Sequence, residues 1–102
     1  MSRIIKTTVN MKANSYLMSD SEFATAVELI VGGFEKKYNY TLVDVTDMRR
    51  HDLREYLHEA DPMMPFSVLD EVVSFAQNAS NDASVYLLRT DSEVCGIISV
   101  QG

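Results

Sequence analysis

Several residue types are scarce in this sequence, and each scarcity excludes a class of protein. The single cysteine, Cys95, leaves no internal disulfide, which is typical of the reducing cytosol. No apolar run approaches the roughly 20 residues that a membrane-spanning helix needs. The first ten residues lack both the apolar stretch and the small-residue cleavage site of a secretion signal. We therefore expect a cytoplasmic protein with no membrane contact.

Basic residues are few, with 9 Lys+Arg against 15 Asp+Glu and a net charge of −6. This acidity argues against general nucleic-acid binding, which depends on Lys and Arg. The charge is unevenly placed, because residues 1–18 carry three bases and no acid, whereas residues 55–102 carry eight acids and one base, Arg89. The acidic part is either a solvated surface or a face that docks on the basic surface of a partner.

The residues that are present favour one small folded domain. The chain has 102 residues, which is room for a single domain over 1–102. Apolar residues make up 46% and are spread along the whole chain, so they can close a core, which argues against disorder.

The N-terminal segment has the pattern of a strand. Apolar and polar residues alternate over Arg3–Ala13, which predicts a half-exposed strand. A turn at Lys12–Ser15 would then lead into a short second strand at Tyr16–Met18.

A helix is predicted next. Ser19 and Glu22 have the spacing of a capping box, and the apolar residues over Phe23–Tyr38 recur on one helix face. Gly32 and Gly33 would lie inside this helix. They indicate either close packing against a sheet or a kink where a ligand approaches the backbone.

The remainder of the chain alternates between strand and helix patterns. The predicted elements are a strand at Tyr40–Val45, helices at about Met48–Ala60 and Phe66–Ala79, and a hairpin of Ser84–Arg89 with Val94–Val100. Because Tyr40–Val45 is apolar on both faces, we expect an interior strand. Thr46 or Asp47 is the expected cap of the helix that follows. The fold class is α+β, with a small antiparallel or mixed sheet of four or five strands and three helices packed on a face.

Chemically active residues do not form a recognisable site. His51 and His58 are two helical turns apart, about 10 Å, which is too far to share one metal ion. Glu55 and His58 make one Glu-x-x-His pair, whereas a di-iron bundle needs two. Cys95 is either buried or a nucleophile, and nothing local would lower its pKa. We expect no catalytic residue, no metal and no cofactor, and hence no enzyme.

One segment between the second and third helices resembles a contact surface. Met63, Met64 and Phe66 surround Pro65, and methionine is common at adaptable binding surfaces. These side chains either form an apolar patch with an acidic rim or fill the gap between the two helices. The candidate partner-binding residues are Glu55, Glu59, Asp61, Met63, Met64, Phe66, Asp70 and Glu71.

The order of elements over residues 40–100 resembles the N-terminal half of a GCN5-related N-acetyltransferase. The segment Val85–Val100, with Gly96, is similar to the second and third strands of that family. The glycine-rich loop that binds the acetyl-CoA pyrophosphate in the family is absent from this sequence. A permuted version would place the cofactor half at Ile4–Met11, the first helix and Tyr40–Val45, and its loop Lys12–Ser21 contains no glycine. The resemblance therefore implies a topology and no site residues.

Together these observations favour a small acidic protein-binding module without enzymatic activity. We expect an inhibitor or adaptor that occupies the surface of another protein, one with a basic surface. Its general type is similar to small acidic phage-encoded inhibitors, which act in the host cytoplasm on defence or nucleic-acid-binding proteins. One alternative is a degenerate acetyltransferase-like domain that binds acetyl-CoA. Another is a self-associating module, such as a homodimer, that pairs its lysine-bearing N-terminal strand with a neighbouring edge.

Overall fold

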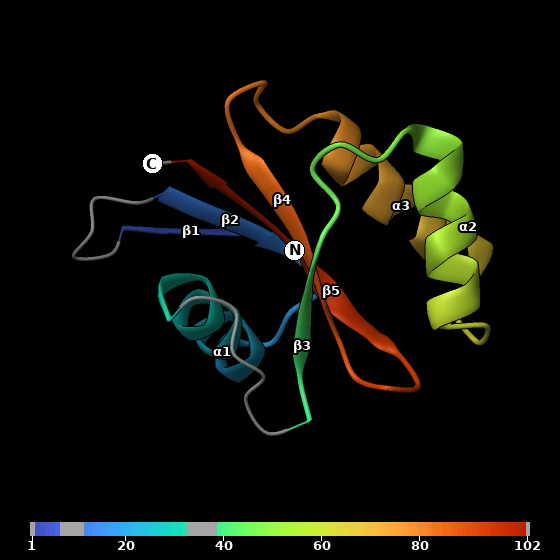
Figure 1. Cartoon of the computed structure of the whole chain (residues 1–102), viewed down its shortest axis with the longest axis horizontal. Helices are drawn as coiled ribbons and strands as arrows, with labels where there is room; N and C mark the ends of the chain where they lie inside the picture. The colour runs from blue at the N-terminus through green and yellow to red at the C-terminus, as the bar shows by residue number, and fades with distance from the viewer. Residues whose placement is uncertain (1, 7–11, 33–38, 102) are drawn as a thin grey trace.

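The computed structural model describes residues 2–6, 12–32 and 39–101 of the chain. Within them, five strands form one sheet in the order β1-β2-β5-β4-β3, and every neighbouring pair is antiparallel (Figure 1). The elements are β1 (Ser2–Lys6), β2 (Lys12–Tyr16), α1 (Asp20–Val31), β3 (Thr41–Asp44), α2 (Arg50–Ala60), α3 (Phe66–Gln77), β4 (Ser84–Arg89) and β5 (Val94–Gln101). The predicted α+β class and the predicted C-terminal hairpin are confirmed.

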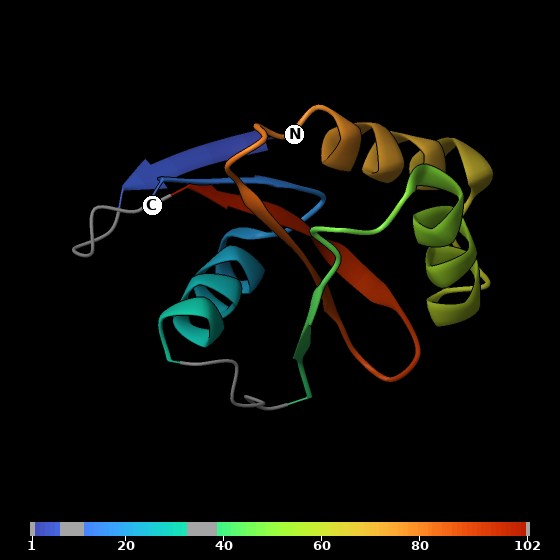
Figure 2. The same ribbon diagram turned by 45° about the horizontal axis from the view of Figure 1, so that its top comes forward.

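The helices cover both faces of the sheet, not one face as the sequence led us to expect. Figure 2 shows α1 on one side and the pair α2 and α3 on the other. The reason is that the central strands are apolar on both faces. Ile97 and Ile98 are adjacent in β5 and both are fully buried, each in a different hydrophobic cluster. A strand with two apolar faces needs a covering layer on each.

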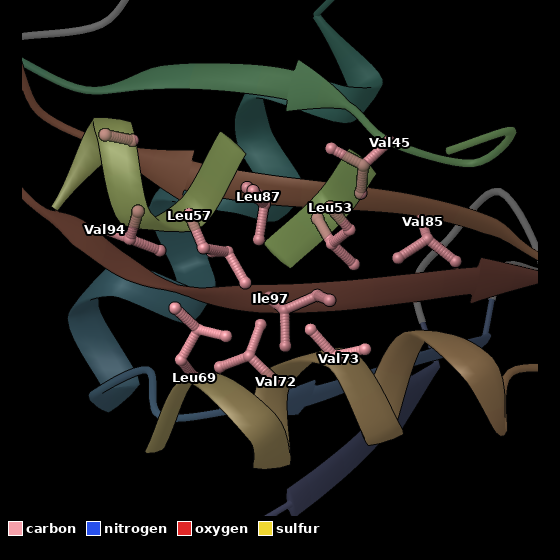
Figure 3. Close-up of a cluster of buried hydrophobic side chains, with 11 residues drawn as sticks. Val45, Leu53, Leu57, Leu69, Val72, Val73, Val85, Leu87, Val94 and Ile97 are labelled. Atoms are coloured by element: carbon pink, nitrogen blue, oxygen red, sulfur yellow. The ribbon is translucent and has the colours of Figure 1, made fainter. Parts of the chain in front are cut away.

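The larger cluster lies between the sheet and the α2–α3 pair. Figure 3 shows Leu53 and Leu57 of α2, and Leu69 of α3, pointing toward Ile97 and Leu87 of the central strands. The smaller cluster lies under α1, where Phe23 and the other buried residues of that helix meet the opposite face of β4 and β5. Burial of side chains of this size contributes about 1.5–3 kcal/mol each, so the two clusters together hold the three layers.

An irregularity in β5 lets the chain cross from β2 to α1. The pairing between β4 and β5 shifts so that Leu88 pairs with Gly96 and Arg89 with Val94, which leaves Cys95 as an extra residue. Where β2 ends, the backbone turns tightly over Gly96, with Leu17 at a φ of 74°. A Cβ atom on Gly96 would lie 2.7 Å from the carbonyl oxygen of Tyr16 and 2.5 Å from a Met18 side-chain carbon. Position 96 therefore has no room for a side chain.

Substitution of Gly96 tests whether the backbone between β2 and α1 packs tightly over this residue. We expect Gly96→Ala to lower the free energy of unfolding by about 1–3 kcal/mol, because the added methyl group forces backbone shifts in a packed region. Chemical denaturation measures the loss, and Cys95→Ala at the neighbouring extra residue is the control with the smaller expected effect. A Gly96→Ala protein as stable as the wild type would contradict the tight crossing.

The N-terminal predictions are only partly correct. The expected single strand over Arg3–Ala13 is divided into β1 and β2, which pair with each other, and residues 7–11 lie outside the described residues. The expected turn at Lys12–Ser15 lies within strand β2. The strand expected at Tyr16–Met18 is also wrong, because β2 ends at Tyr16 and Leu17 leaves the extended conformation. Period-two alternation continues through both strands of a hairpin, so it did not reveal the turn.

The capping box at the start of α1 is confirmed. The Ser19 hydroxyl accepts the Glu22 backbone N–H at 3.2 Å, and the Glu22 carboxylate accepts the Ser19 backbone N–H at 2.8 Å. The helix was expected to continue past Gly32 and Gly33, and this prediction is wrong, because Gly32 is the C-cap of α1. Its N–H donates to the backbone carbonyl of Glu28 at 2.8 Å. Glycine disfavours a helix interior, and this preference ends the helix. Residues 33–38 of the expected helix lie outside the described residues.

Two expectations about the region around β3 are also wrong. β3 is an edge strand and not an interior one, although Val43 packs toward the α2–α3 side and Leu42 toward the α1 side. Helix packing on both faces, rather than a second neighbouring strand, accounts for its apolar residues. The N-cap of α2 is Arg49, with no side-chain cap. Neither Thr46 nor Asp47, the two expected caps, fills that position. Thr46 instead accepts the Val85 backbone N–H at 3.0 Å and so ties the end of β3 to β4.

Candidate functional site

The turn that joins α2 to α3 presents two large apolar side chains to solvent. Met63 is 89% exposed and Phe66 is 64% exposed. Between them, Met64 is half-buried and packs against the larger hydrophobic cluster. The two alternatives from the sequence therefore each hold for part of this segment: Met64 fills the gap between the helices, whereas Met63 and Phe66 form an exposed apolar patch. We call residues 61–66 the α2–α3 turn.

Local backbone bonds define this turn. Asp61 ends α2, with its N–H donated to Leu57 at 2.9 Å, and Met64 donates its N–H to the carbonyl of Asp61 at 3.1 Å. Pro65 is the N-cap of α3, and its carbonyl accepts the Leu69 N–H at 3.0 Å. Proline favours the start of a helix because it has no N–H to lose and a fixed φ. The turn therefore has a defined conformation that holds its exposed side chains outward.

His58 adds an aromatic surface to the patch. Its ring lies nearly parallel to that of Phe66, with ring centroids 5.8 Å apart and an interplanar angle of 20°. Both residues are exposed, so the stack fixes the Phe66 ring without burying it. The exposed residues of the patch are thus His58, Met63 and Phe66.

Three of the acidic candidates are occupied within the molecule. Asp70 forms an ion pair with Arg54 across the two helices, and Glu71 accepts a hydrogen bond from the Tyr16 hydroxyl of β2. Asp61 accepts the backbone N–H of Val94 at 3.1 Å. These carboxylates hold the helices and strands together, so their role in the fold is structural.

The remaining two acidic candidates, Glu55 and Glu59, are exposed on α2. No ion pair or hydrogen bond involves either of them within the described residues. They lie on the solvent side of the helix, because the buried face consists of Leu53, Leu57 and Ala60. They are therefore the carboxylates of the predicted set that are free to contact another molecule.

The β4–β5 turn lies beside this surface, which the sequence did not indicate. Arg89 donates a hydrogen bond to the Tyr56 hydroxyl at 2.9 Å, and its guanidinium carbon lies 5.7 Å from the Tyr56 ring centroid. Together with the Asp61–Val94 bond, this contact attaches the turn to α2, and the turn contributes the exposed carboxylate of Asp91. Arg89 and Tyr56 are 33 residues apart, and a contact over that separation leaves no periodic pattern in the sequence. Only the structure shows that the β4–β5 turn lies beside α2.

The N-terminus of α1 does not fit the pyrophosphate of acetyl-CoA. In the permuted arrangement that the resemblance implies, this helix would follow the cofactor loop. Its first turn carries Asp20 and Glu22, which repel an anion, and the capping box already uses the Glu22 N–H. No residue between Lys12 and Asp20 is a glycine, so close approach of the backbone to a phosphate is hindered.

The described residues contain no group of three or more His, Cys, Asp or Glu side chains that could hold a metal ion. His51 lies within ion-pair distance of Asp52, at 3.1 Å, and both are exposed at the start of α2. His58 stacks on Phe66 instead of facing another ligand. The two histidines thus occupy the solvent side of α2, and the structure does not bring them together.

Cys95 lies on the α1 side of β5, near Glu22 and Glu93. Burial raises the pKa of the Cys95 thiol to about 11, and the negative charges of Glu22 and Glu93 add to the effect. A raised pKa keeps the thiol protonated at neutral pH, which is the opposite of what a nucleophile needs.

Comparisons with protein-family models, curated proteins and solved structures find no match to this chain. In the described part of the chain, no helix combines the length and apolar character that crossing a membrane would require.

Removal of the Asp61 carboxylate tests its structural role. Asp61→Ala leaves the Val94 N–H without its acceptor, so we expect a loss of about 1–3 kcal/mol in the free energy of unfolding. Asp61→Asn retains an acceptor and is expected to lose less. Glu59→Ala, at an exposed carboxylate two positions earlier, is the matched control with almost no change. Equal denaturation midpoints for Asp61→Ala and Glu59→Ala would contradict the assignment.

Alkylation of Cys95 tests its surroundings. The shift in pKa from 9.0 to about 11 lowers the thiolate fraction about 100-fold at any pH below 9. We therefore expect iodoacetamide to react with the folded protein much more slowly than with a small free thiol at pH 8, and the rate to keep rising up to about pH 11. Mass spectrometry follows the reaction. A rate that levels off near pH 8 would show a thiol with an ordinary or lowered pKa.

Proposed function

We propose that this protein is a non-enzymatic binding module that occupies a basic surface on another protein through the α2–α3 turn. The observation that carries the proposal is the exposure of both Met63 and Phe66 on one turn of defined conformation. Methionine and aromatic residues are enriched at the centres of protein interfaces. Burial of a methionine or phenylalanine side chain contributes about 1.5–3 kcal/mol of favourable free energy. Because Met63 and Phe66 are exposed in this fold, a partner that covers them would gain that free energy on binding.

Charge indicates the chemistry of that partner. Glu55 and Glu59 are exposed on α2 and Asp91 is exposed on the β4–β5 turn. The cations Arg54 and Arg89 are engaged by Asp70 and Tyr56, whereas Arg50 is exposed at the far end of α2 from the turn. A surface with free carboxylates and occupied cations attracts a basic partner and raises its association rate. The partner would present an apolar pocket for Phe66 and Met63, bordered by Lys or Arg.

The turn is also ready to bind without rearrangement. The Arg54–Asp70 ion pair joins α2 to α3, the His58 ring supports Phe66, and Asp61 attaches the turn to β5. Side chains that are already ordered lose less conformational entropy on binding. An inhibitor or adaptor acting in the cytoplasm, including one of the phage-encoded type, needs no more than such a surface, since it works by occupation.

A site-specific photo-crosslinker tests this proposal. A benzophenone amino acid is placed at Met63 or, in a matched control, at Val31, which is also exposed, at 56%, but lies at the end of α1. After irradiation in the cells to which the gene is native, we expect position 63 to yield a defined adduct with a basic protein and position 31 not to do so.

Variants then connect the adduct to the surface. We expect Phe66→Ser to weaken binding of the captured protein at least tenfold, through the loss of buried aromatic area. The double variant Glu55→Lys/Glu59→Lys should weaken it further at low salt, where unscreened charges matter most. Binding that is unchanged by Phe66→Ser, or unchanged between low and high ionic strength, would overturn the proposal.

A further inference from the structure

The methionines in the described part of the chain differ sharply in their surroundings. Met18 packs against the smaller hydrophobic cluster, whereas Met48 and Met64 pack against the larger one, and all three are half-buried. Met63 is 89% exposed and belongs to neither cluster. Among the described methionines, Met63 therefore has the thioether that small solutes reach most freely.

The α2–α3 turn holds Met63 in this exposed position. Met64 donates its N–H to the carbonyl of Asp61 at 3.1 Å, and the Asp61 carboxylate accepts the Val94 N–H of β5 at 3.1 Å. The side chain of Met64, next in the chain, packs against the larger cluster. Burial of the Met63 side chain would therefore require the turn to open.

An exposed thioether reacts with peroxide to form a sulfoxide. A lone pair of the Met63 sulfur attacks one oxygen of hydrogen peroxide, so that an S–O bond forms and the O–O bond breaks. The proton on the transferred oxygen passes to the departing hydroxide, which leaves as water. Sulfur is oxidised and peroxide is reduced, so the step needs no further reactant.

The single thiol of the chain competes weakly for this oxidant. Peroxide reacts with a thiolate, and burial raises the pKa of the Cys95 thiol to about 11, which keeps it protonated at neutral pH. A thioether has no proton to lose, so its reaction depends on exposure and not on a lowered pKa. Exposure therefore favours Met63 over both Cys95 and the half-buried methionines.

From these contrasts we infer that Met63 is a modification site for peroxide and that its sulfoxide releases the partner of the α2–α3 turn. The modification site stands on the exposure and packing of the methionines. The release of a partner rests on the function proposed above for the turn. The device would make binding sensitive to oxidants, and reversibly so, because methionine sulfoxide reductases restore the thioether.

The effect on binding follows from the polarity of the new group. A sulfoxide turns a flexible apolar side chain into a polar one. A partner that covers Met63 with apolar surface would have to bury the sulfoxide oxygen without a hydrogen-bond donor, which costs free energy. The fold itself does not bury Met63, so the modification leaves both clusters intact.

Peptide mapping of the peroxide-treated protein tests the modification site. Fragment spectra that cut between Met63 and Met64 assign the added oxygen, and Met64 is the matched internal control. We expect Met63 to react about tenfold faster than Met64 in the folded protein, since exposure sets the rate. In urea, where the fold is lost, the two rates should become similar. Similar rates in the folded protein would overturn the inference.

The stability of the oxidised protein separates modification from damage. Oxidation is expected to leave the denaturation midpoint unchanged. Met63→Leu, which keeps the apolar side chain at nearly the same volume and has no sulfur, is the matched control. A midpoint that falls on oxidation of the wild type but not of Met63→Leu would show that Met63 supports the fold, which contradicts the inference.

The partner captured by crosslinking tests the release. The protein is oxidised, the peroxide is removed with catalase, and only then is the partner added. We expect binding to weaken about tenfold, through the loss of apolar contact, and to return after treatment with a methionine sulfoxide reductase. Met63→Leu should bind equally well before and after peroxide.

The outcomes distinguish this inference from the proposed function. Unchanged binding after complete oxidation of Met63, or an equal loss in Met63→Leu, would overturn the release. If Phe66→Ser still weakens binding in that case, the surface itself stands. If Phe66→Ser has no effect, the surface fails and the release fails with it, whereas the peptide map alone decides the modification site.

Discussion

The central strand β5 is the constraint on which the rest of the molecule depends. Two adjacent residues of this strand, Ile97 and Ile98, are fully buried on opposite faces of the sheet. The sheet can therefore be stable only with a helical layer on each side. The extra residue at Cys95 and the bare backbone of Gly96 let the chain pass from β2 to α1 over this strand. One strand therefore sets the two cores and the route between them.

This arrangement determines what the surface offers. With α2 and α3 bound to one face, the turn between them lies at the edge of the molecule (Figure 1). Met63 and Phe66 of this turn are therefore exposed. Carboxylates near the turn divide into two groups. Those such as Asp70 are used in holding the helices, whereas Glu55 and Glu59 face solvent. The acidic charge of the second half is thus partly structural and partly available for a partner.

Local signals were readable from the sequence, and distant ones were not. The capping box at Ser19 and the C-terminal hairpin depend on residues a few positions apart, and both are as predicted. The Tyr16–Glu71 hydrogen bond joins residues that are 55 positions apart in the sequence. The sequence alone therefore does not distinguish a carboxylate that is bonded within the fold, such as Glu71, from one that is free. The exposure of Phe66 was one of two open alternatives, because helical spacing places a residue on a face without showing whether another element covers it.

The α2–α3 turn is a preformed surface that exposes Met63 and Phe66, while Met64 fills the gap between the two helices. Methyl-labelled methionine gives the most direct measurement, because Met63 and Met64 are adjacent and differ in burial. A soluble paramagnetic agent should broaden the Met63 methyl signal strongly and the Met64 signal weakly. Similar broadening of the two signals would show a disordered turn, and protection of Met63 would show a buried one. Either result would contradict the account.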